Sequence, residues 1–108
     1  MVITIKVSSQ YQLNTLIQAL KALAVSARAE RGMLDCKLYQ SVGEETSVCF
    51  VEHWQATDDL EYQMRSNRYT QLLALMETAV EEPSMEFHTV SRTQGLDYLQ
   101  AVRSVGKA

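Results

Sequence analysis

The chain of 108 residues carries 10 Lys and Arg against 13 Asp and Glu, and because its basic residues are scattered we expect no nucleic-acid partner. Its longest apolar run, Leu72–Met76, is far too short to cross a bilayer, and no basic-then-apolar signal peptide opens the chain, so we expect no membrane association and a cytoplasmic location. Cys36 and Cys49 provide neither a disulfide framework nor a zinc spacing, and we expect no metal.

The first two expected elements are a strand and a long helix. Apolar and polar residues alternate over Val2–Val7, which is typical of a strand with one buried face. Ser9 and Gln12 form a capping-box pattern, and apolar residues then recur at helical spacing as far as Arg28. Gly32 is a residue that can take the left-handed conformation found after helices, so it marks the end of this segment.

A hairpin is expected next. Met33–Gln40 and Ser47–Trp54 both alternate like strands, and the polar segment Ser41–Thr46 between them is typical of a turn. If the two strands pair symmetrically about this turn, Cys36 and Cys49 share one face of the sheet. The opposite face of the hairpin then carries Lys37, Tyr39, Phe50, Glu52 and Trp54.

Two helices are expected after the hairpin. Thr57 is a suitable N-cap, and two aspartates follow it in the first turn, where the helix dipole favours negative charge. This first helix should reach about Met64. A second helix should start at Ser66, with apolar residues at helical spacing, and should be closed by Pro83.

The last expected elements are a strand and a short helix. Ser84–Ser91 alternates again and predicts a fourth strand. After Gly95, the segment Leu96–Val105 has apolar residues three apart, which predicts a short helix docked on the domain.

The order of elements predicts an α+β fold of the ferredoxin-like βαββαβ type. Both helices then cover one face of an antiparallel sheet, in a single domain over residues 1–108 with a core at 2–91 and a helical extension at 95–105. The uncovered face mixes aromatic and charged residues, which is explained either by packing against a second copy or by simple exposure to solvent. It would carry Thr4, Lys6, Asp35, Lys37, Tyr39, Phe50, Glu52, Trp54, Glu86, His88 and Val90. We expect a homodimer.

Several of these segments resemble one known family. They are Glu30–Met33, Val51–Trp54, Leu60, Tyr62–Ser66 and Tyr69. Together they resemble the antibiotic biosynthesis monooxygenase family, whose members share E-x-G-C, E-x-W and a helical H-L-x-S-x-H-F motif. The resemblance covers most of the chain. It implies a dimeric α+β barrel, with a pocket between sheet and helices in each protomer.

The resemblance also implies an activity. Some members of the family oxygenate phenolic or quinol substrates without metal or flavin, others degrade haem, and many have no assigned activity. Here Gln63 and Arg68 stand where the family often has its two helical histidines, so that helix has lost a general base. Thr4 and Lys6 on the first strand replace the asparagine of haem-degrading members, so haem degradation is not expected.

The resemblance suggests six site residues. His53, Trp54 and Arg68 are the candidate catalytic residues, as a base or hydrogen-bond donor, an aromatic wall and a fixed cation. Tyr62, Gln63 and Tyr69 are the candidate ligand-binding residues. Four of the six also have a structural interpretation: Trp54 and Tyr69 as core aromatics, His53 as a strand-end residue and Arg68 as a solvated helix residue.

Two functions follow as hypotheses. The first is a cofactor-independent monooxygenase acting on a small aromatic or quinol substrate. The alternative is a non-catalytic dimeric module that binds a small apolar ligand or another protein. Similarity of fold alone does not decide between them.

Overall fold

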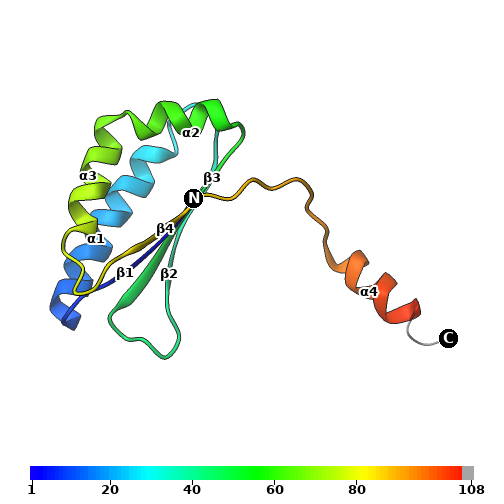
Figure 1. The fold of residues 1–108 in the computed structure, drawn as a ribbon, viewed down its shortest axis with the longest axis horizontal. Helices are drawn as coiled ribbons and strands as arrows, with labels where there is room; N and C mark the ends of the chain where they lie inside the picture. Colours follow the sequence, from blue (N-terminus) through cyan, green and yellow to red (C-terminus); the bar gives the residue numbers. More distant parts are fainter. Residues whose placement is uncertain (106–108) are drawn as a thin grey trace.

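The structure, a computed structural model, describes residues 1–105. Its elements are β1 (Val2–Lys6), α1 (Gln10–Ala27), β2 (Met33–Gln40), β3 (Ser47–Trp54), α2 (Thr57–Met64), α3 (Asn67–Met76), β4 (Ser84–Glu86) and α4 (Leu96–Val105). The four strands form one antiparallel sheet in the order β2-β3-β1-β4, with α1 and α3 on one face (Figure 1). The predicted ferredoxin-like α+β fold is confirmed.

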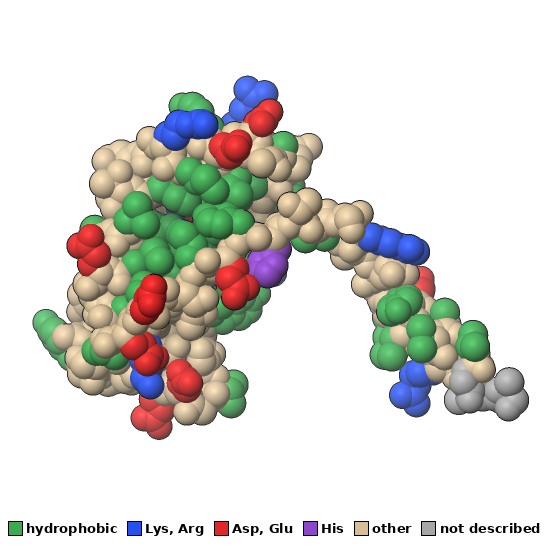
Figure 2. All heavy atoms as spheres, viewed as in Figure 1, with side chains coloured by type: hydrophobic (Ala, Val, Ile, Leu, Met, Phe, Trp, Pro, Cys, Tyr) green, Lys and Arg blue, Asp and Glu red, His purple; other side chains and the backbone are tan. Residues whose placement is uncertain are grey.

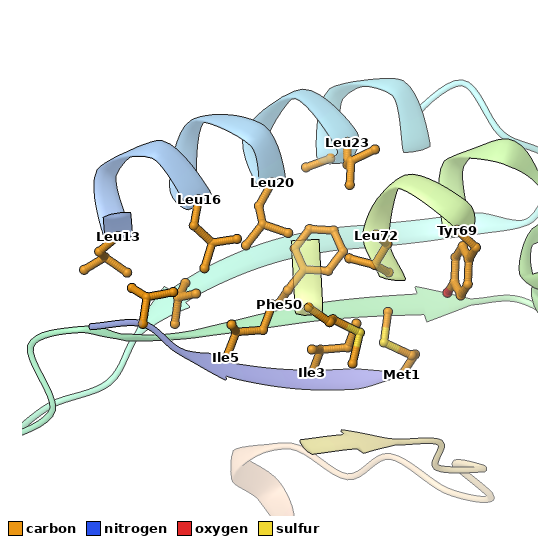
Figure 3. Packing of buried hydrophobic residues seen from close by; sticks show 14 residues of the cluster. Met1, Ile3, Ile5, Leu13, Leu16, Leu20, Leu23, Phe50, Tyr69 and Leu72 are labelled. Atoms are coloured by element: carbon orange, nitrogen blue, oxygen red, sulfur yellow. The ribbon is translucent and has the colours of Figure 1, made fainter. Parts of the chain in front are cut away.

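The hydrophobic core lies between this sheet and the two long helices (Figure 3). β1 contributes Ile3 and Ile5, α1 contributes a stripe of leucines, and Phe50 of β3 lies between them with no exposed surface. Burying one such side chain stabilises the fold by about 1.5–3 kcal/mol relative to leaving it in water. The alternation of β1 and the helical spacing of α1 therefore have the same cause, since each presents one apolar side to the other.

The N-terminus of α1 and the bend after its C-terminus follow the expected local chemistry. Ser9 is the N-cap, and its hydroxyl oxygen accepts a hydrogen bond from the backbone N–H of Gln12 at 3.2 Å. Gly32 takes a positive φ of 83°, and its carbonyl accepts a hydrogen bond from the backbone of Gln55 at 2.7 Å. This bend brings the start of β2 beside the end of β3.

The pairing of β2 with β3 corrects the expected faces of the hairpin. Cys36 pairs with Glu52, Leu38 with Phe50 and Tyr39 with Cys49, one residue away from symmetric pairing about the turn. A shift of one residue turns every β3 side chain to the other face. The register is held by the core, because β1 pairs with β3 so that Ile3 lies opposite Phe50.

Two faces of the sheet can now be defined. The helix-side face carries Ile3, Ile5, Cys36, Leu38, Val48, Phe50, Glu52, Trp54 and Met85. The open face carries Val2, Thr4, Lys6, Asp35, Lys37, Tyr39, Cys49, Val51, His53, Ser84 and Glu86. The prediction that Phe50, Glu52 and Trp54 lie on the open face was wrong, and so was the prediction that Cys36 and Cys49 share a face.

The helices after the hairpin start close to the expected residues, but the second is shorter. The N-cap of α2 is Ala56, one residue before the predicted Thr57, and Ser66 caps α3 as expected. α3 ends at Met76 and does not continue to Pro83. The chain leaves the helix there because the backbone N–H of Val80 donates to the carbonyl of Lys6 at 2.9 Å, which draws the segment to the sheet.

The C-terminal part of the chain differs most from expectation. β4 ends at Glu86, opposite Val2, because β1 provides no further strand residue to pair with the rest of the predicted strand Ser84–Ser91. α4 forms at the predicted residues, yet none of its side chains is buried, so the predicted docking was wrong. The intervening segment, 87–95, forms no regular structure and holds α4 away from the sheet and helices (Figure 1). Hydrophobic side chains gather on this separate helix (Figure 2).

Candidate functional site

A buried carboxylate lies at the centre of the polar residues between sheet and helices. Glu52 has no exposed surface, and its Oε2 lies 2.5 Å from a guanidinium nitrogen of Arg68. Its Oε1 accepts hydrogen bonds from the Tyr69 hydroxyl at 2.5 Å and from the Trp54 indole N–H at 3.2 Å. A buried charge is tolerated only when it is paired and hydrogen-bonded, and Glu52 is both.

Arg68 is held by five different partners. Besides the ion pair with Glu52, its Nε donates to the Gln63 side-chain oxygen at 3.4 Å and another nitrogen donates to the carbonyl of Leu23 at 3.5 Å. Its guanidinium carbon lies 6.0 Å from the ring centre of Trp54 and 5.5 Å from that of Tyr69. Both distances are within the range of a cation–π interaction. Arg68 is therefore fixed in place and is not a solvated helix residue, whereas its role as a cation that holds a substrate stays a prediction.

Gln63 extends the network to the segment after α1. Its side-chain N–H donates to the Glu30 carboxylate at 2.9 Å. Ser66 separates α2 from α3, and its hydroxyl oxygen accepts a hydrogen bond from the backbone N–H of Tyr69 at 3.4 Å. This break between the two helices allows the side chains of Gln63 and Arg68 to meet. The six residues of this network are called the Glu52 cluster: Glu30, Glu52, Trp54, Gln63, Arg68 and Tyr69.

The protonation of Tyr69 is governed by its surroundings. Burial, followed by the negative charge of Glu52 and the hydrogen bond to it, raises the pKa of the Tyr69 hydroxyl well above its usual range. Tyr69 therefore stays a neutral phenol that donates a hydrogen bond. It does not supply a phenolate base at physiological pH.

The structure brings four of the six predicted site residues together: Trp54, Gln63, Arg68 and Tyr69. His53 points to the open face instead, where its Nδ1 lies 2.5 Å from a carboxylate oxygen of Asp35. It is separated from Trp54 because successive strand residues face opposite ways. Tyr62 is 70% exposed on α2 and makes no part of the Glu52 cluster.

Two members of the cluster were not predicted as site residues, Glu30 and Glu52. A signal for the buried pair was present in the sequence. Glu52 continues the alternation of Val48 and Phe50 on β3, and Arg68 precedes Leu72 by one helical turn on the apolar stripe of α3. An acid and a base that each occupy a core position point to a buried ion pair.

Two surface hollows are lined by residues outside the Glu52 cluster. One, of about 490 Å³, lies between α1 and α3 and is lined by Ala19, Ala22, Leu23, Ser26, Gln71, Ala74 and Leu75. The other, of about 390 Å³, is lined by Arg28 and residues 33–37 of β2. Within residues 1–105, no group of three or more His, Cys, Asp or Glu side chains is placed to hold a metal ion. The same residues contain no helix long and apolar enough to span a membrane.

Cys36 of β2 pairs with Glu52 on the helix-side face of the sheet. Its thiol is expected to resist alkylation. Burial, and to a lesser extent the charge of Glu52, raises the pKa of its thiol from 9.0 to about 12. At pH 8 the thiolate, which is the reactive form, is then about a thousandfold rarer in the folded than in the unfolded chain. Iodoacetamide labelling with peptide mass spectrometry, in buffer and in urea, measures this. Equal labelling rates in the two conditions would contradict it.

The same shift sets a pH dependence of stability. The folded chain holds the Cys36 proton more tightly than the unfolded chain. The protonated thiol therefore makes its full contribution to the free energy of unfolding below pH 9, and this contribution falls as the pH rises toward 12. A Cys36→Ser variant should lack this part of the alkaline decline in urea unfolding.

Comparison with known proteins identifies the family. Residues 1–75 match the model of the family described as antibiotic biosynthesis monooxygenase. The chain belongs to this family. The matched part runs from β1 through most of α3 and includes the whole Glu52 cluster, so the predicted resemblance is confirmed. No curated protein matches the chain.

Solved structures share the fold of this family member. A proposed antibiotic biosynthesis monooxygenase from Nitrosomonas europaea has a TM-score of 0.73 at 14% identity, covering 87% of this chain and 90% of that one. Another, from Deinococcus radiodurans, has a TM-score of 0.65 at 20% identity and covers 88% and 100%. A protein of unknown function from Bacteroides thetaiotaomicron, described as a possible oxidoreductase, has a TM-score of 0.68 at 18% identity and covers 79% and 88%. At sequence identities this low, the similarity shows a shared fold and not a shared activity.

Proposed function

We propose that this member of the antibiotic biosynthesis monooxygenase family binds a small aromatic or quinol substrate against Trp54 and oxygenates it without a cofactor. The observation that carries the proposal is the position of Trp54, a partly exposed aromatic ring at the surface of the Glu52 cluster with the buried Arg68 guanidinium behind it. An indole offers a flat apolar surface to an aromatic ring. Family membership supplies the reaction class.

The residues of the cluster restrict which substrates are suitable. Glu52 is fully buried and already accepts hydrogen bonds from Arg68, Tyr69 and Trp54, so it is not proposed as the base that takes a substrate proton. His53 lies on the open face and is not proposed as the base. The suitable substrates are therefore electron-rich rings that ionise without assistance. The protein supplies the binding surface.

The test uses a reduced 1,4-naphthoquinone and isotopically labelled oxygen gas. In monooxygenation the quinol and O₂ give a hydroxynaphthoquinone and water, the substrate supplying all four electrons. Simple oxidation gives the unsubstituted quinone and hydrogen peroxide, with no label in the ring. We expect labelled hydroxynaphthoquinone, formed at a rate at least tenfold lower in Trp54→Leu, because that change removes the stacking surface worth about 1.5 kcal/mol or more.

Two matched variants control this measurement. Tyr11→Leu removes an aromatic ring that is 81% exposed on α1, and His53→Ala removes the histidine of the open face. Both should keep the rate of the unchanged protein. A labelled product formed no faster than without protein would contradict the monooxygenase proposal.

The second candidate function is a non-catalytic binding module of the same family. It is favoured by the absence of histidine from the Glu52 cluster and by the complete pairing of Glu52, because no group there is ready to move a proton. Trp54 is the one tryptophan of the chain, so quenching of its fluorescence by oxidised naphthoquinone reports binding directly. Quenching that saturates, without labelled product, would select this function.

Either function is proposed for a homodimer joined through the open face. Val2, Thr4, Cys49 and Val51 occupy the centre of this face, and no helix of the described residues covers them. A sheet face with an apolar centre and charged margins is typical of an interface between identical subunits. Sedimentation equilibrium at micromolar concentration should give twice the subunit mass, and a single-subunit mass would refute the dimer.

A further inference from the structure

α4 presents an apolar side that nothing in its own subunit covers. Val102 is 53% and Val105 79% exposed. A helix of 10 residues is marginal in water by itself and is stabilised mainly by packing of its apolar side. Helical spacing places the apolar residues on one side and polar residues on the other: Tyr98, Ala101, Val102 and Val105 against Asp97, Gln100 and Ser104. α4 therefore needs a surface to pack on. It lies beyond residues 1–75, which match the family, so family membership does not supply that surface.

The outer surface of the helix layer contains a groove of suitable shape. It is the hollow of about 490 Å³ between α1 and α3, and we call it the α1–α3 groove. Ala22 and Ala74 are exposed on its two walls, and the buried Leu23 lies beneath them. Alanines on both walls leave space for the side chains of a third helix to enter between the first two. The groove faces away from the sheet, so it is separate from the open face.

We propose that α4 of one copy of this chain docks in the α1–α3 groove of a second copy. The linker 87–95 leads α4 away from its own helices, and the groove of its own subunit stays open (Figure 1). The lengths agree, because the apolar side of α4 from Tyr98 to Val105 and the wall of the groove from Ala19 to Ser26 each extend about 10 Å.

Charge determines the direction of the docked helix. The C-terminus of α3 closes one end of the groove with Glu77, and no basic residue in its last turn offsets the helix dipole. Arg103 is a basic residue in the last turn of α4. When α4 runs parallel to α3 with Val102 in the groove, its rotation brings Arg103 over α3 near Glu77. The reverse direction would bring Asp97 to Glu77, which sets two carboxylates together.

Disulfide formation between two differently tagged chains tests this contact. In a Cys36→Ala, Cys49→Ala background, a chain with Ala22→Cys is co-expressed with a mass-tagged chain with Ala101→Cys. Mild oxidation should give a covalent heterodimer, because the docked helix places Ala101 on the side of α1 and level with Ala22. Neither chain has two cysteines, so no link within one chain is possible. The matched control is Gln100→Cys, on the polar side of α4, which should give at least tenfold less heterodimer.

Two further changes measure the packing and the charge. Val102→Glu, in the chain with Ala101→Cys, should slow cross-linking at least tenfold because it brings a carboxylate into an apolar groove. Glu77→Arg in one chain or Arg103→Glu in the other should each slow it about threefold, and the two together should restore it, as expected for an exposed ion pair. None of the side chains of α4 is buried in its own subunit, so the changes in α4 leave the fold intact.

Three outcomes would overturn the proposal. The first is heterodimer at the level of the Gln100→Cys control, and the second is a rate that Val102→Glu does not change, which would indicate random collision. The third is a disulfide that forms only within one chain when Ala22→Cys and Ala101→Cys are combined, because α4 would then dock on its own subunit. Sedimentation tests the open-face dimer and labelled product tests the oxygenation, so failure of those proposals is distinguished from failure of this one.

Discussion

Replacing Arg68 with methionine is expected to lower the free energy of unfolding by about 3–5 kcal/mol, because it leaves the buried carboxylate of Glu52 without its counter-charge. Glu52 has no exposed surface and cannot regain water where it lies. Methionine keeps the volume of the side chain, so little of the loss comes from a cavity. Urea unfolding followed by far-ultraviolet circular dichroism measures the change.

The control for this prediction is Arg65→Met. Arg65 is exposed at the C-terminal end of α2, and its side chain donates only to the carbonyl of Glu61, at 3.3 Å, so its replacement should cost less than about 0.5 kcal/mol. A double variant, Glu52→Leu with Arg68→Met, should recover most of the stability, because an apolar pair replaces the ion pair at similar volume. A loss below 1 kcal/mol in Arg68→Met would show that Glu52 is not confined as described.

The second large effect is expected for Gly32→Ala, which should destabilise the fold by about 2–4 kcal/mol through two causes that act together. Gly32 has a φ of 83°, a conformation that costs a residue with a side chain. A Cβ atom there would also lie 2.2 Å from a carboxylate oxygen of Asp59 and 2.6 Å from its Cβ. The chain must move at the junction of α1, β2 and α2 to relieve this overlap.

Gly43→Ala separates the two causes. Gly43 has a similar φ of 86°, but a Cβ atom there meets nothing within 4 Å. It should lose only the conformational part, about 1–2 kcal/mol. Thermal unfolding of both variants measures the difference, which the prediction assigns to the contact with Asp59. Equal losses at the two glycines would show that Asp59 moves aside without cost.

Local sequence signals were sufficient to predict where most helices and strands begin. The alternation of β1, the leucine stripe of α1 and the Ser66 cap of α3 each reflect interactions within a few residues, and each element formed where expected. α3 and β4 ended early for a different reason. Their ends depend on which residues of β1 remain available for pairing, as the hydrogen bond from Val80 to Lys6 and the contact of Glu86 with Val2 illustrate.

The candidate site was only partly accessible from the sequence. The family motif brought attention to Trp54, Gln63, Arg68 and Tyr69, and the fold places these four side chains in one network. His53 could not be assigned correctly, because its face depends on the register of β2 with β3. Symmetric pairing about the turn and the observed pairing differ by a single residue, and that residue exchanges the environments of His53 and Glu52.

The amino-acid sequence alone determined the class of fold, the order of its elements and the family, because periodicity, capping and motif spacing are local properties of the chain. The tertiary structure decided which face each β3 residue occupies, that Glu52 and Arg68 form a buried pair, and that α4 lies away from the core. These depend on long-range packing: Phe50 lies opposite Ile3 in the core, which fixes the register of β3 and places Glu52 within 2.5 Å of Arg68.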